Sequence, residues 1–308
     1  MTKAAVLRKF GEPFTIEDID VGEGNPVEVK AAGICGRDLV VWKGGFKNLV
    51  PPLILGHEIF GESQGNSVGV FGMETCGECK YCREGKDNLC VKGKLLGEWR
   101  PGGYSKVVIS SDLFRLPDSQ YEKYAAAVCP VATAIHSAKV GKIRKGDTVL
   151  VTGAGGGVGI HTIQYLKHIG AKVISLTSPT KRETVSKFSD QVVYKISEIR
   201  DVDAVIELVG KDTINDSLKA LRREGSLILV GNVSGSEISL IRPALTIMRE
   251  QRIIGSASYT RSEVMEAVKL IHEGVIKPFF KSYPLNEVNR AYSDIIQGKV
   301  IGRAVLLS

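Results

Sequence analysis

Short apolar runs alternate with helical patterns through the middle of the chain. Four of these runs have the length and continuous apolar character of strands buried in a parallel sheet, and they cover residues 147–152, 172–177, 204–209 and 226–230. A helical pattern follows the first run, with Ile160, Ile163, Leu166 and Ile169 on a similar face, and further helices are predicted over 181–188 and 213–221. Strands and helices in alternation predict an α/β fold with a doubly wound parallel sheet of the Rossmann type.

The two ends of the chain show a different pattern. The first third is rich in glycine, proline and short β-like runs, such as residues 27–31 and 106–109, with a turn at Pro51 and Pro52. The tail, from about Tyr259, contains one amphipathic helix over 262–273 and ends in an apolar strand over 303–307. These segments predict a β-rich part outside the parallel sheet, and the chain has no internal repeat.

Composition and charge narrow the class of protein. The chain has 308 residues, of which 43% are hydrophobic and 24% charged, with a net charge of +7. The first ten residues are too short and too charged for a signal peptide, and no apolar run reaches the roughly 20 residues of a membrane span. We therefore expect a cytoplasmic protein with no membrane partner. Basic residues form no dense tract, so the charge favours a mildly basic surface or an anionic cofactor over nucleic acid.

Four of the six cysteines form a compact cluster: Cys76, Cys79, Cys82 and Cys90. Two-residue gaps let a tight loop direct successive sulfurs to one centre, and four thiolates close the tetrahedral shell of zinc. Without a secretion signal, the cluster favours metal over disulfides. We predict a structural zinc that stabilises a lobe with little core of its own. The alternatives are reduced buried cysteines and a zinc-ribbon-like nucleic-acid module.

The other two cysteines, Cys35 and Cys129, flank the pair His57 and Glu58 in the sequence. An open catalytic zinc needs three protein ligands and one exchangeable position, and two cysteines with one histidine are a known set. Taken singly, such residues are more often ordinary core side chains. Their wide separation means that spacing alone does not define a site.

A glycine-rich loop follows the first predicted strand and opens a helix. It contains Gly153, Gly155, Gly156, Gly157, Val158 and Gly159. Glycines at such a loop allow a tight turn and let the backbone approach a pyrophosphate at the helix N-terminus. The strand–loop–helix context predicts a dinucleotide site; the alternative is a tight turn without a ligand.

The end of the second strand predicts which cofactor binds there. Specificity for NAD usually needs an acidic residue at this position, and here the segment carries Thr177, Ser178, Lys181 and Arg182 instead. Hydroxyls and two cations suit a 2′-phosphate, so we predict NADP(H) in preference to NAD(H). The alternative is that Lys181 and Arg182 form a solvated first helical turn.

The ordered set of motifs resembles the zinc-dependent medium-chain dehydrogenase/reductase superfamily, the alcohol dehydrogenase family, nearly end to end. This resemblance implies a catalytic zinc on Cys35, His57 and Cys129, with Glu58 as an alternate or neighbouring ligand. It also implies that Asp38 accepts a hydrogen bond from His57 and that the zinc acts as a Lewis acid. The further residues it places against the cofactor are Thr133, Val230, Gly231 and Asn232 at the nicotinamide and Arg303 at the pyrophosphate.

The chain departs from the family pattern at two positions beside Cys35. Alcohol dehydrogenases of this family usually carry a hydroxyl residue and a histidine that pass a proton outward, and Arg37 and Val40 stand there instead. Arg37 could stabilise an enolate-like charge on an acyl thioester, or it could form a salt bridge elsewhere. Residues 150–164 and 227–233, with the Cys-x-Arg-Asp motif, are similar to archaeal acryloyl-CoA reductases of the same superfamily. The stretch after Gly61 also lacks the usual long hairpin.

The resemblance implies a β-rich, GroES-like catalytic domain over residues 1–129, a Rossmann domain over 130–258 and a return to the catalytic domain over 259–308. The expected activity is interconversion of a small alcohol and its aldehyde or ketone by hydride transfer with NADP(H). The alternatives are an NADPH-dependent enoyl- or acryloyl-CoA reductase and a non-catalytic NADP(H)-sensing zinc protein. The resemblance suggests a homodimer or homotetramer.

Overall fold

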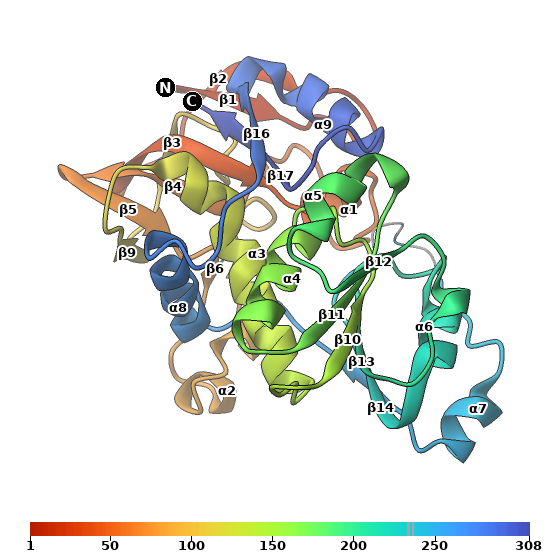
Figure 1. Cartoon of the computed structure of the whole chain (residues 1–308). Helices are drawn as coiled ribbons and strands as arrows, with labels where there is room; N and C mark the ends of the chain where they lie inside the picture. Colours follow the sequence, from red (N-terminus) through yellow and green to blue (C-terminus); the bar gives the residue numbers. More distant parts are fainter. Residues whose placement is uncertain (233–234, 236) are drawn as a thin grey trace.

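The computed structural model describes residues 1–232, 235 and 237–308 (Figure 1). Six parallel strands form the sheet in the middle of the chain, in the order β12 (Gln191–Val193), β11 (Lys172–Leu176), β10 (Thr148–Val151), β13 (Val202–Glu207), β14 (Leu221–Leu229) and β15 (Arg252–Gly255). Counted along the chain this order reads 3-2-1-4-5-6, which is that of a dinucleotide-binding Rossmann sheet. The Rossmann prediction is confirmed, and the strand order reverses between β10 and β13.

Helices pack around this sheet, and the first three of them contribute buried residues to its core, whereas the fourth has no buried residue. They are α4 (Gly159–His168), α5 (Arg182–Ser186), α6 (Ile214–Ala220) and α7 (Pro243–Met248). Ile160, Ile163 and Leu166 of α4 are fully buried, as the helical period predicted. Sequence patterns did not predict the short strands β12 and β15.

A second sheet of seven strands combines the C-terminal strand with strands from the first third of the chain. Its strands run β16 (Phe280–Pro284), β17 (Arg303–Leu307), β3 (Pro26–Ile34), β4 (Glu58–Ser63), β5 (Asn66–Val70) and β9 (Leu113–Arg115), and β8 (Val107–Ile109) also pairs with β3. The tail strand β17 pairs antiparallel with β3, so the end of the chain returns to the N-terminal part. Both chain ends therefore lie on the same side of the molecule (Figure 1).

Smaller elements complete this β-rich part. The strands β1 (Thr2–Val6) and β2 (Thr15–Ile19) pair with each other, as do β6 (Met73–Glu74) and β7 (Lys94–Leu95). The helices here are α1 (Gly36–Trp42), α2 (Lys80–Arg83), α8 (Arg261–His272) and α9 (Val288–Ile296). In the described residues, no helix combines the length and the apolar character that crossing a membrane would require.

The β4–β5 hairpin closes with only two residues between the paired Ser63 and Asn66. Gln64 and Gly65 both have positive φ, 49° and 75°, which is the backbone of a type I′ turn. A tight turn therefore stands where the resemblance leads one to expect a long hairpin.

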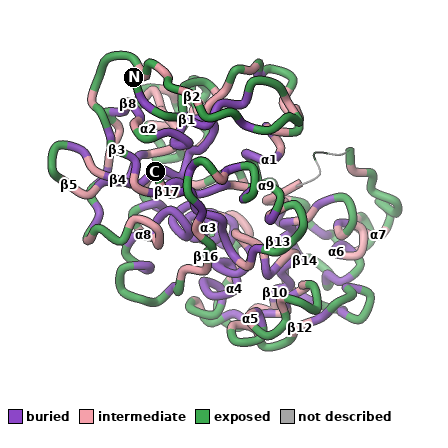
Figure 2. Tube along the Cα trace, turned by 90° about the horizontal axis from the view of Figure 1, so that it is seen from above, coloured by how far each residue is buried: buried purple, intermediate pink, exposed green. Residues whose placement is uncertain are grey.

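One long helix, α3 (Tyr121–Val140), lies between the two sheets (Figure 1). It contacts α4 and α8 as well as β3, β4 and β17, and its central residues are buried (Figure 2). A Cβ on Gly33 of β3 would lie 2.4 Å from the carbonyl of Ala125, so glycine lets strand and helix pack at very close range. The predicted domain division at 129/130 falls inside this helix and stays a prediction.

Candidate metal and cofactor sites

The four clustered cysteines lie on a small lobe built around α2 and a short 3₁₀ turn, Asp87–Leu89. Their sulfurs all lie within 4.8 Å of one another, and two of the separations, Cys79 to Cys82 and Cys76 to Cys90, are 3.5 Å. Four sulfurs at ~2.3 Å from one zinc would be about 3.8 Å apart, so the cluster has the dimensions of a tetrahedral site.

Backbone amides next to the cluster favour the thiolate form of a cysteine, which is the form that binds a metal. Hydrogen bonds from the amides of Cys82 and Val91 lower the pKa of Cys79 to about 6, whereas partial desolvation and neighbouring sulfurs raise the pKa of Cys82 to about 12. Thiolates forced together without a cation oppose each other's ionisation, and a divalent metal removes that conflict. The donor set therefore fits zinc.

The structure also brings together Cys35, His57, Glu58 and Cys129, which are far apart in sequence. Cys35 caps the N-terminus of α1, His57 directly precedes β4, Glu58 begins β4, and Cys129 lies in the middle of α3. Their ligand atoms lie within 4.8 Å of one another, and three of the four residues are buried. A buried set of two thiols, an imidazole and a carboxylate is the donor set of an open zinc site.

Arg303 is the cation beside this cluster. Its Nη2 donates to Oε1 of Glu58 at 2.7 Å and lies 3.8 Å from the sulfur of Cys129. Burial raises the pKa of Glu58 to about 7, although the charge of Arg303 opposes the shift. In the described residues, three buried atoms of the cluster have no hydrogen-bond partner: Nδ1 of His57, Oε2 of Glu58 and Nε of Arg303. Such unpartnered polar atoms are expected where a metal or ligand completes a site.

Asp38 lies beside His57, as the resemblance implied, but the expected hydrogen bond is not formed. Oδ1 of Asp38 is 3.4 Å from Nδ1 of His57, in an ion-pair contact without hydrogen-bond geometry. The other oxygen accepts from the backbone amide of Cys35 at 2.8 Å and from the Tyr104 hydroxyl at 3.0 Å. These two donors hold the carboxylate in a position where Oδ1 does not form a hydrogen bond with the imidazole.

Arg37 forms the salt bridge that was one of its two expected roles. Its guanidinium binds the buried carboxylate of Glu98, with Nη2 3.0 Å from Oε2, and lies 4.5 Å over the ring of Phe46. A Cβ on Gly235 would lie 3.8 Å from the side chain of Val40. The charge of Arg37 is thus balanced by Glu98, and neither residue supplies a proton relay beside Cys35.

The glycine-rich loop lies at the carboxyl end of β10, where the strand order reverses. Gly153 has φ +61°, and a Cβ on Gly159 would lie 2.3 Å from the carbonyl of Gly153, so the turn requires glycine at both positions. The loop is covered by the tail, since the Gly302 amide donates to the Gly155 carbonyl at 3.4 Å. A Cβ on Gly157 would lie 2.8 Å from Nη1 of Arg303, which places this guanidinium between the loop and the metal cluster.

The predicted cofactor-selecting residues gather beside the loop. A Cβ on Gly155 would lie 2.9 Å from the Thr177 hydroxyl, and the Ser178 hydroxyl is 3.0 Å from that of Thr180. Lys181 is half-buried, its ammonium donates to the Val300 carbonyl at 2.7 Å, and burial lowers its pKa. Arg182 is exposed at the start of α5.

The residues expected at the nicotinamide lie on two sides of the cleft. Thr133 is buried on α3, one turn after Cys129, and its hydroxyl donates to the Cys129 carbonyl at 2.8 Å. Val230 and Gly231 follow β14, and their amides donate to the Glu207 carbonyl at 3.1 and 3.2 Å. Asn232 is next to Gly210, where a Cβ would lie 2.8 Å from its Oδ1.

Sequence reasoning missed Glu207, a fully buried carboxylate at the end of β13. It accepts five hydrogen bonds, from the hydroxyls of Thr152, Thr213 and Ser217 and from the amides of Val209 and Gly210. Thr152 belongs to the loop after β10, whereas the other donors lie in the segment after β13 that runs into α6, so Glu207 joins these two segments at the strand-order reversal. An acid inside an otherwise apolar strand run was the available signal.

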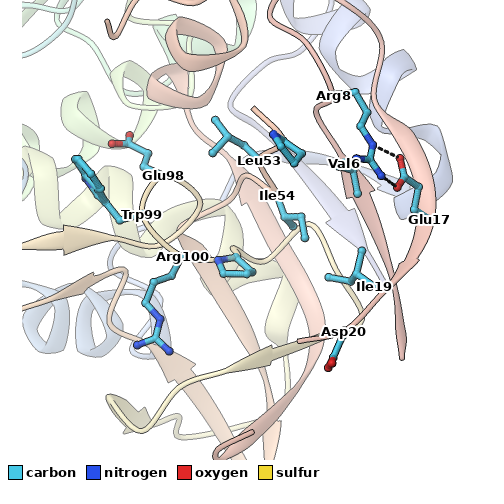
Figure 3. Close-up of a pocket in the computed structure, with 12 residues that line it drawn as sticks. Val6, Arg8, Glu17, Ile19, Asp20, Leu53, Ile54, Glu98, Trp99 and Arg100 are labelled. Atoms are coloured by element: carbon cyan, nitrogen blue, oxygen red, sulfur yellow. Dashed lines mark hydrogen bonds and ion pairs between the residues drawn. The ribbon is translucent and has the colours of Figure 1, made fainter. Parts of the chain in front are cut away.

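A separate pocket of about 300 Å³ opens on the outer face of the β-rich part (Figure 3). Aliphatic side chains of Leu53 and Ile54 lie between the Arg8–Glu17 ion pair and the half-exposed Trp99. Glu98, which binds Arg37, also lines it, so the pocket touches the metal site only through this pair.

Comparisons with known proteins agree with this architecture. The family described as "Alcohol dehydrogenase GroES-like domain" matches residues 25–118, and "Zinc-binding dehydrogenase" matches residues 157–273. The fold and the two-part match define a nicotinamide-dependent oxidoreductase. More specifically, the chain belongs to the zinc-dependent alcohol dehydrogenase family of medium-chain dehydrogenases and reductases.

Individual relatives are similar along nearly their whole length. The chain is 33% identical to the acryloyl-coenzyme A reductase of Metallosphaera sedula, and 99% of each chain is covered. It is 32% identical to the NAD-dependent alcohol dehydrogenase of Sulfolobus acidocaldarius, again covering 99% of both. The crystal structure of the alcohol dehydrogenase from Aeropyrum pernix superimposes with a TM-score of 0.91 at 27% identity, over 99% of this chain and 100% of that one. These relatives are catalysts, which argues against a non-catalytic sensing protein.

Proposed function

We propose that the protein transfers hydride between NADP(H) and a small alcohol or carbonyl compound at a zinc held by Cys35, His57 and Cys129. The observation that carries this proposal is the buried convergence of these three side chains with Glu58, next to the crevice of the Rossmann sheet. The bound zinc supplies a Lewis acid for the substrate oxygen, and the nicotinamide supplies or accepts the hydride.

The protein's own residues position these groups. Glu58 and Arg303 form an ion pair beside the sulfur of Cys129, so a carboxylate and a cation balance each other's charge in the buried cluster. The side chains of Thr177 and Lys181 lie directly against Gly155, and Arg303 lies directly against Gly157, so all three are within reach of a pyrophosphate bound at this loop. The second, four-cysteine zinc is structural, because four thiolates leave no position for substrate.

The preference for NADP(H) rests on the side chains beside Gly155. Thr177, Ser178 and Lys181 line the end of β11 together with Arg182, and β11 ends without an acid. A 2′-phosphate would draw the Lys181 ammonium away from the Val300 carbonyl.

A second candidate reaction is NADPH-dependent reduction of an enoyl thioester. It is favoured by Arg37 and Val40, since neither can act as the proton relay that alcohol oxidation uses in this family. The similarity to the acryloyl-coenzyme A reductase supports the same reading.

The homodimer or homotetramer that we propose has one suitable surface. The strand β15 forms an edge of the parallel sheet, and Ile253 on it is partly exposed, as are Ile247 and Met248 of α7. An exposed apolar edge strand is a template for pairing with a second copy, and sedimentation of the intact protein measures the assembly.

One substrate panel tests the activity. NADPH and NADH oxidation would be followed with aldehydes, ketones and short enoyl-CoA thioesters, with Cys129→Ser as the control that lacks a zinc ligand. We expect turnover with NADPH that Cys129→Ser loses. Turnover confined to enoyl-CoA selects the second candidate, and no turnover with any class refutes both.

A further inference from the structure

Asp38 connects the two segments that carry the ligands Cys35 and His57. It is the third residue of α1 and is only 3% exposed. One oxygen accepts from the Cys35 amide at 2.8 Å, and the other lies 3.4 Å from Nδ1 of His57. This carboxylate therefore lies beside Nδ1 of the imidazole, close enough for a small movement to form the hydrogen bond that would fix the ring and leave Nε2 for a metal.

The Tyr104 hydroxyl is what holds Asp38 in that orientation. It donates to Oδ2 at 3.0 Å, and in the described part of the chain Asp38 forms no ion pair with a lysine or arginine. Tyr104 is fully buried, and its hydroxyl also lies 3.4 Å from the hydroxyl of the buried Tyr292. Burial and the charge of Asp38 raise the pKa of Tyr104 well above that of a free phenol, which keeps the hydroxyl protonated.

The Tyr104 ring is itself fixed beneath His57. Its backbone amide donates to the Leu55 carbonyl at 3.0 Å, and its carbonyl accepts from the Ala5 amide at 2.8 Å. Gly56, directly before His57, has φ +98°, and a Cβ there would lie 2.5 Å from the ring. Glycine at position 56 thus lets the ring pack directly against the backbone that carries the histidine.

We propose that Tyr104 is a positioning residue for the catalytic metal, acting through Asp38 on His57. The inference rests on the proposed zinc site and goes beyond it, since Tyr104 touches neither the ligands' donor atoms nor the substrate cleft. Removing the hydroxyl leaves the Cys35 amide as the remaining one of these two donors, so Asp38 is held less firmly toward His57. Partners of this kind typically contribute 10- to 100-fold in metal affinity.

The test measures zinc retention rather than turnover. Wild type, Tyr104→Phe and a matched control would be loaded with zinc and titrated with a chelator. The control is Tyr283→Phe, because Tyr283 is also buried and donates to a carboxylate, Asp294, at 2.8 Å, away from the cluster. Zinc that the wild type binds and Cys129→Ser does not bind is assigned to the Cys35 site, which is formed by Cys35, His57 and Cys129. We expect ~10- to 100-fold weaker zinc at that site in Tyr104→Phe only, with the four-cysteine zinc unchanged.

A double-mutant cycle tests whether Tyr104 acts through Asp38, and Asp38→Asn alone keeps the inference falsifiable if Tyr104→Phe folds poorly. Asp38→Asn should weaken zinc by at least as much, and adding Tyr104→Phe to it should cause no further loss. Unchanged zinc affinity in Tyr104→Phe, or losses that add in the double variant, overturns the role of Tyr104. A wild type with no zinc at the Cys35 site instead overturns the proposed function, and the inference with it.

Discussion

The guanidinium of Arg303 and the carboxylate of Glu58 form a fully buried ion pair, with Nη2 and Oε1 2.7 Å apart and 4% or less of either side chain exposed. The pair joins the tail strand β17 to β4, which begins at the metal cluster. Because Nη1 of Arg303 also lies against Gly157, this one side chain links the cluster of Cys35, His57, Glu58 and Cys129 to the glycine-rich loop. The return of the tail to the N-terminal sheet thus has a direct consequence for the site.

We predict that Arg303→Met destabilises the protein by about 3–5 kcal/mol, because it leaves the Glu58 carboxylate buried without its cation. The double variant with Glu58→Gln should recover most of that loss. Urea unfolding of the four proteins of this cycle, each stripped of metal and cofactor, measures the coupling. Strictly additive losses would show that the pair contributes no stability beyond its separate members.

Replacing Lys181 and Arg182 by alanine should raise KM for NADPH and leave KM for NADH nearly unchanged. A lost hydrogen bond to a charged group is worth about 1.5–3 kcal/mol, which corresponds to roughly 10- to 100-fold in KM. Steady-state kinetics with both cofactors measures the difference. Lys187→Ala is the matched control, since Lys187 follows the same helix and its ammonium pairs with Glu183 at 3.7 Å. Equal changes for the two cofactors would rule out recognition of the 2′-phosphate.

Strands and helices that follow from a local pattern of apolar and polar residues were predicted correctly from the sequence. The apolar run before the glycine-rich loop and the helix after it lie where expected, and so does the tail strand containing Arg303. The strands β12 and β15 escaped prediction because each has only three or four residues, and β15 has little burial to give a periodic signal. The domain division placed at Cys129 falls inside α3, whose uniformly apolar centre shows no boundary.

Partners across the fold could not be predicted. The carboxylate that binds Arg37 is Glu98, and the donor to Asp38 is Tyr104, more than 60 residues away in each case. Such pairs depend on how α1 packs against the loop before β8. A pattern of neighbouring residues in the sequence gives no information about that packing. Glu207 differs, because a carboxylate in a buried strand must find donors, and its position alone could have marked it.

Protonation of His161 should destabilise the protein in mild acid. The Phe279 amide donates to its Nε2 at 3.3 Å, so Nδ1 must carry the proton that is donated to the Gly157 carbonyl at 2.7 Å. Burial lowers the pKa of His161 from 6.5 to about 4. Between these two pKa values the unfolded chain binds more protons than the folded protein. The contribution of His161 to the free energy of unfolding is therefore complete above pH ~6.5, and it falls by roughly 3 kcal/mol as the pH drops to about 4.

Urea unfolding between pH 4 and 7.5 measures this slope in wild type and in His161→Gln. The variant should lose stability at neutral pH and show a flatter dependence on pH. His168→Gln, which removes an exposed histidine from the same helix, should keep the wild-type slope. A slope that survives in His161→Gln would assign the acid sensitivity to other groups.

The four-cysteine lobe should stabilise the connection between the parallel sheet and α8. Asp87, three residues before Cys90, accepts from the Arg261 amide at 3.1 Å, and the Asn88 side chain donates to the Ala257 carbonyl at 2.7 Å. Helix α8, which begins at Arg261, packs on α3, and α3 carries Cys129. A lobe held by metal therefore fixes the segment that leads into α8.

We predict that the double variant Asp87→Ala/Asn88→Ala exchanges backbone hydrogens faster at residues 255–262 while it keeps its zinc. The lost hydrogen bonds correspond to about 1–3 kcal/mol of local stability. Cys82→Ser should give the same local change together with loss of the lobe's metal. Glu78→Ala is the control, because Glu78 is exposed and pairs only with Lys92 in the same lobe. If Cys82→Ser left exchange at 255–262 unaltered, the lobe's metal would have no part in holding this connection.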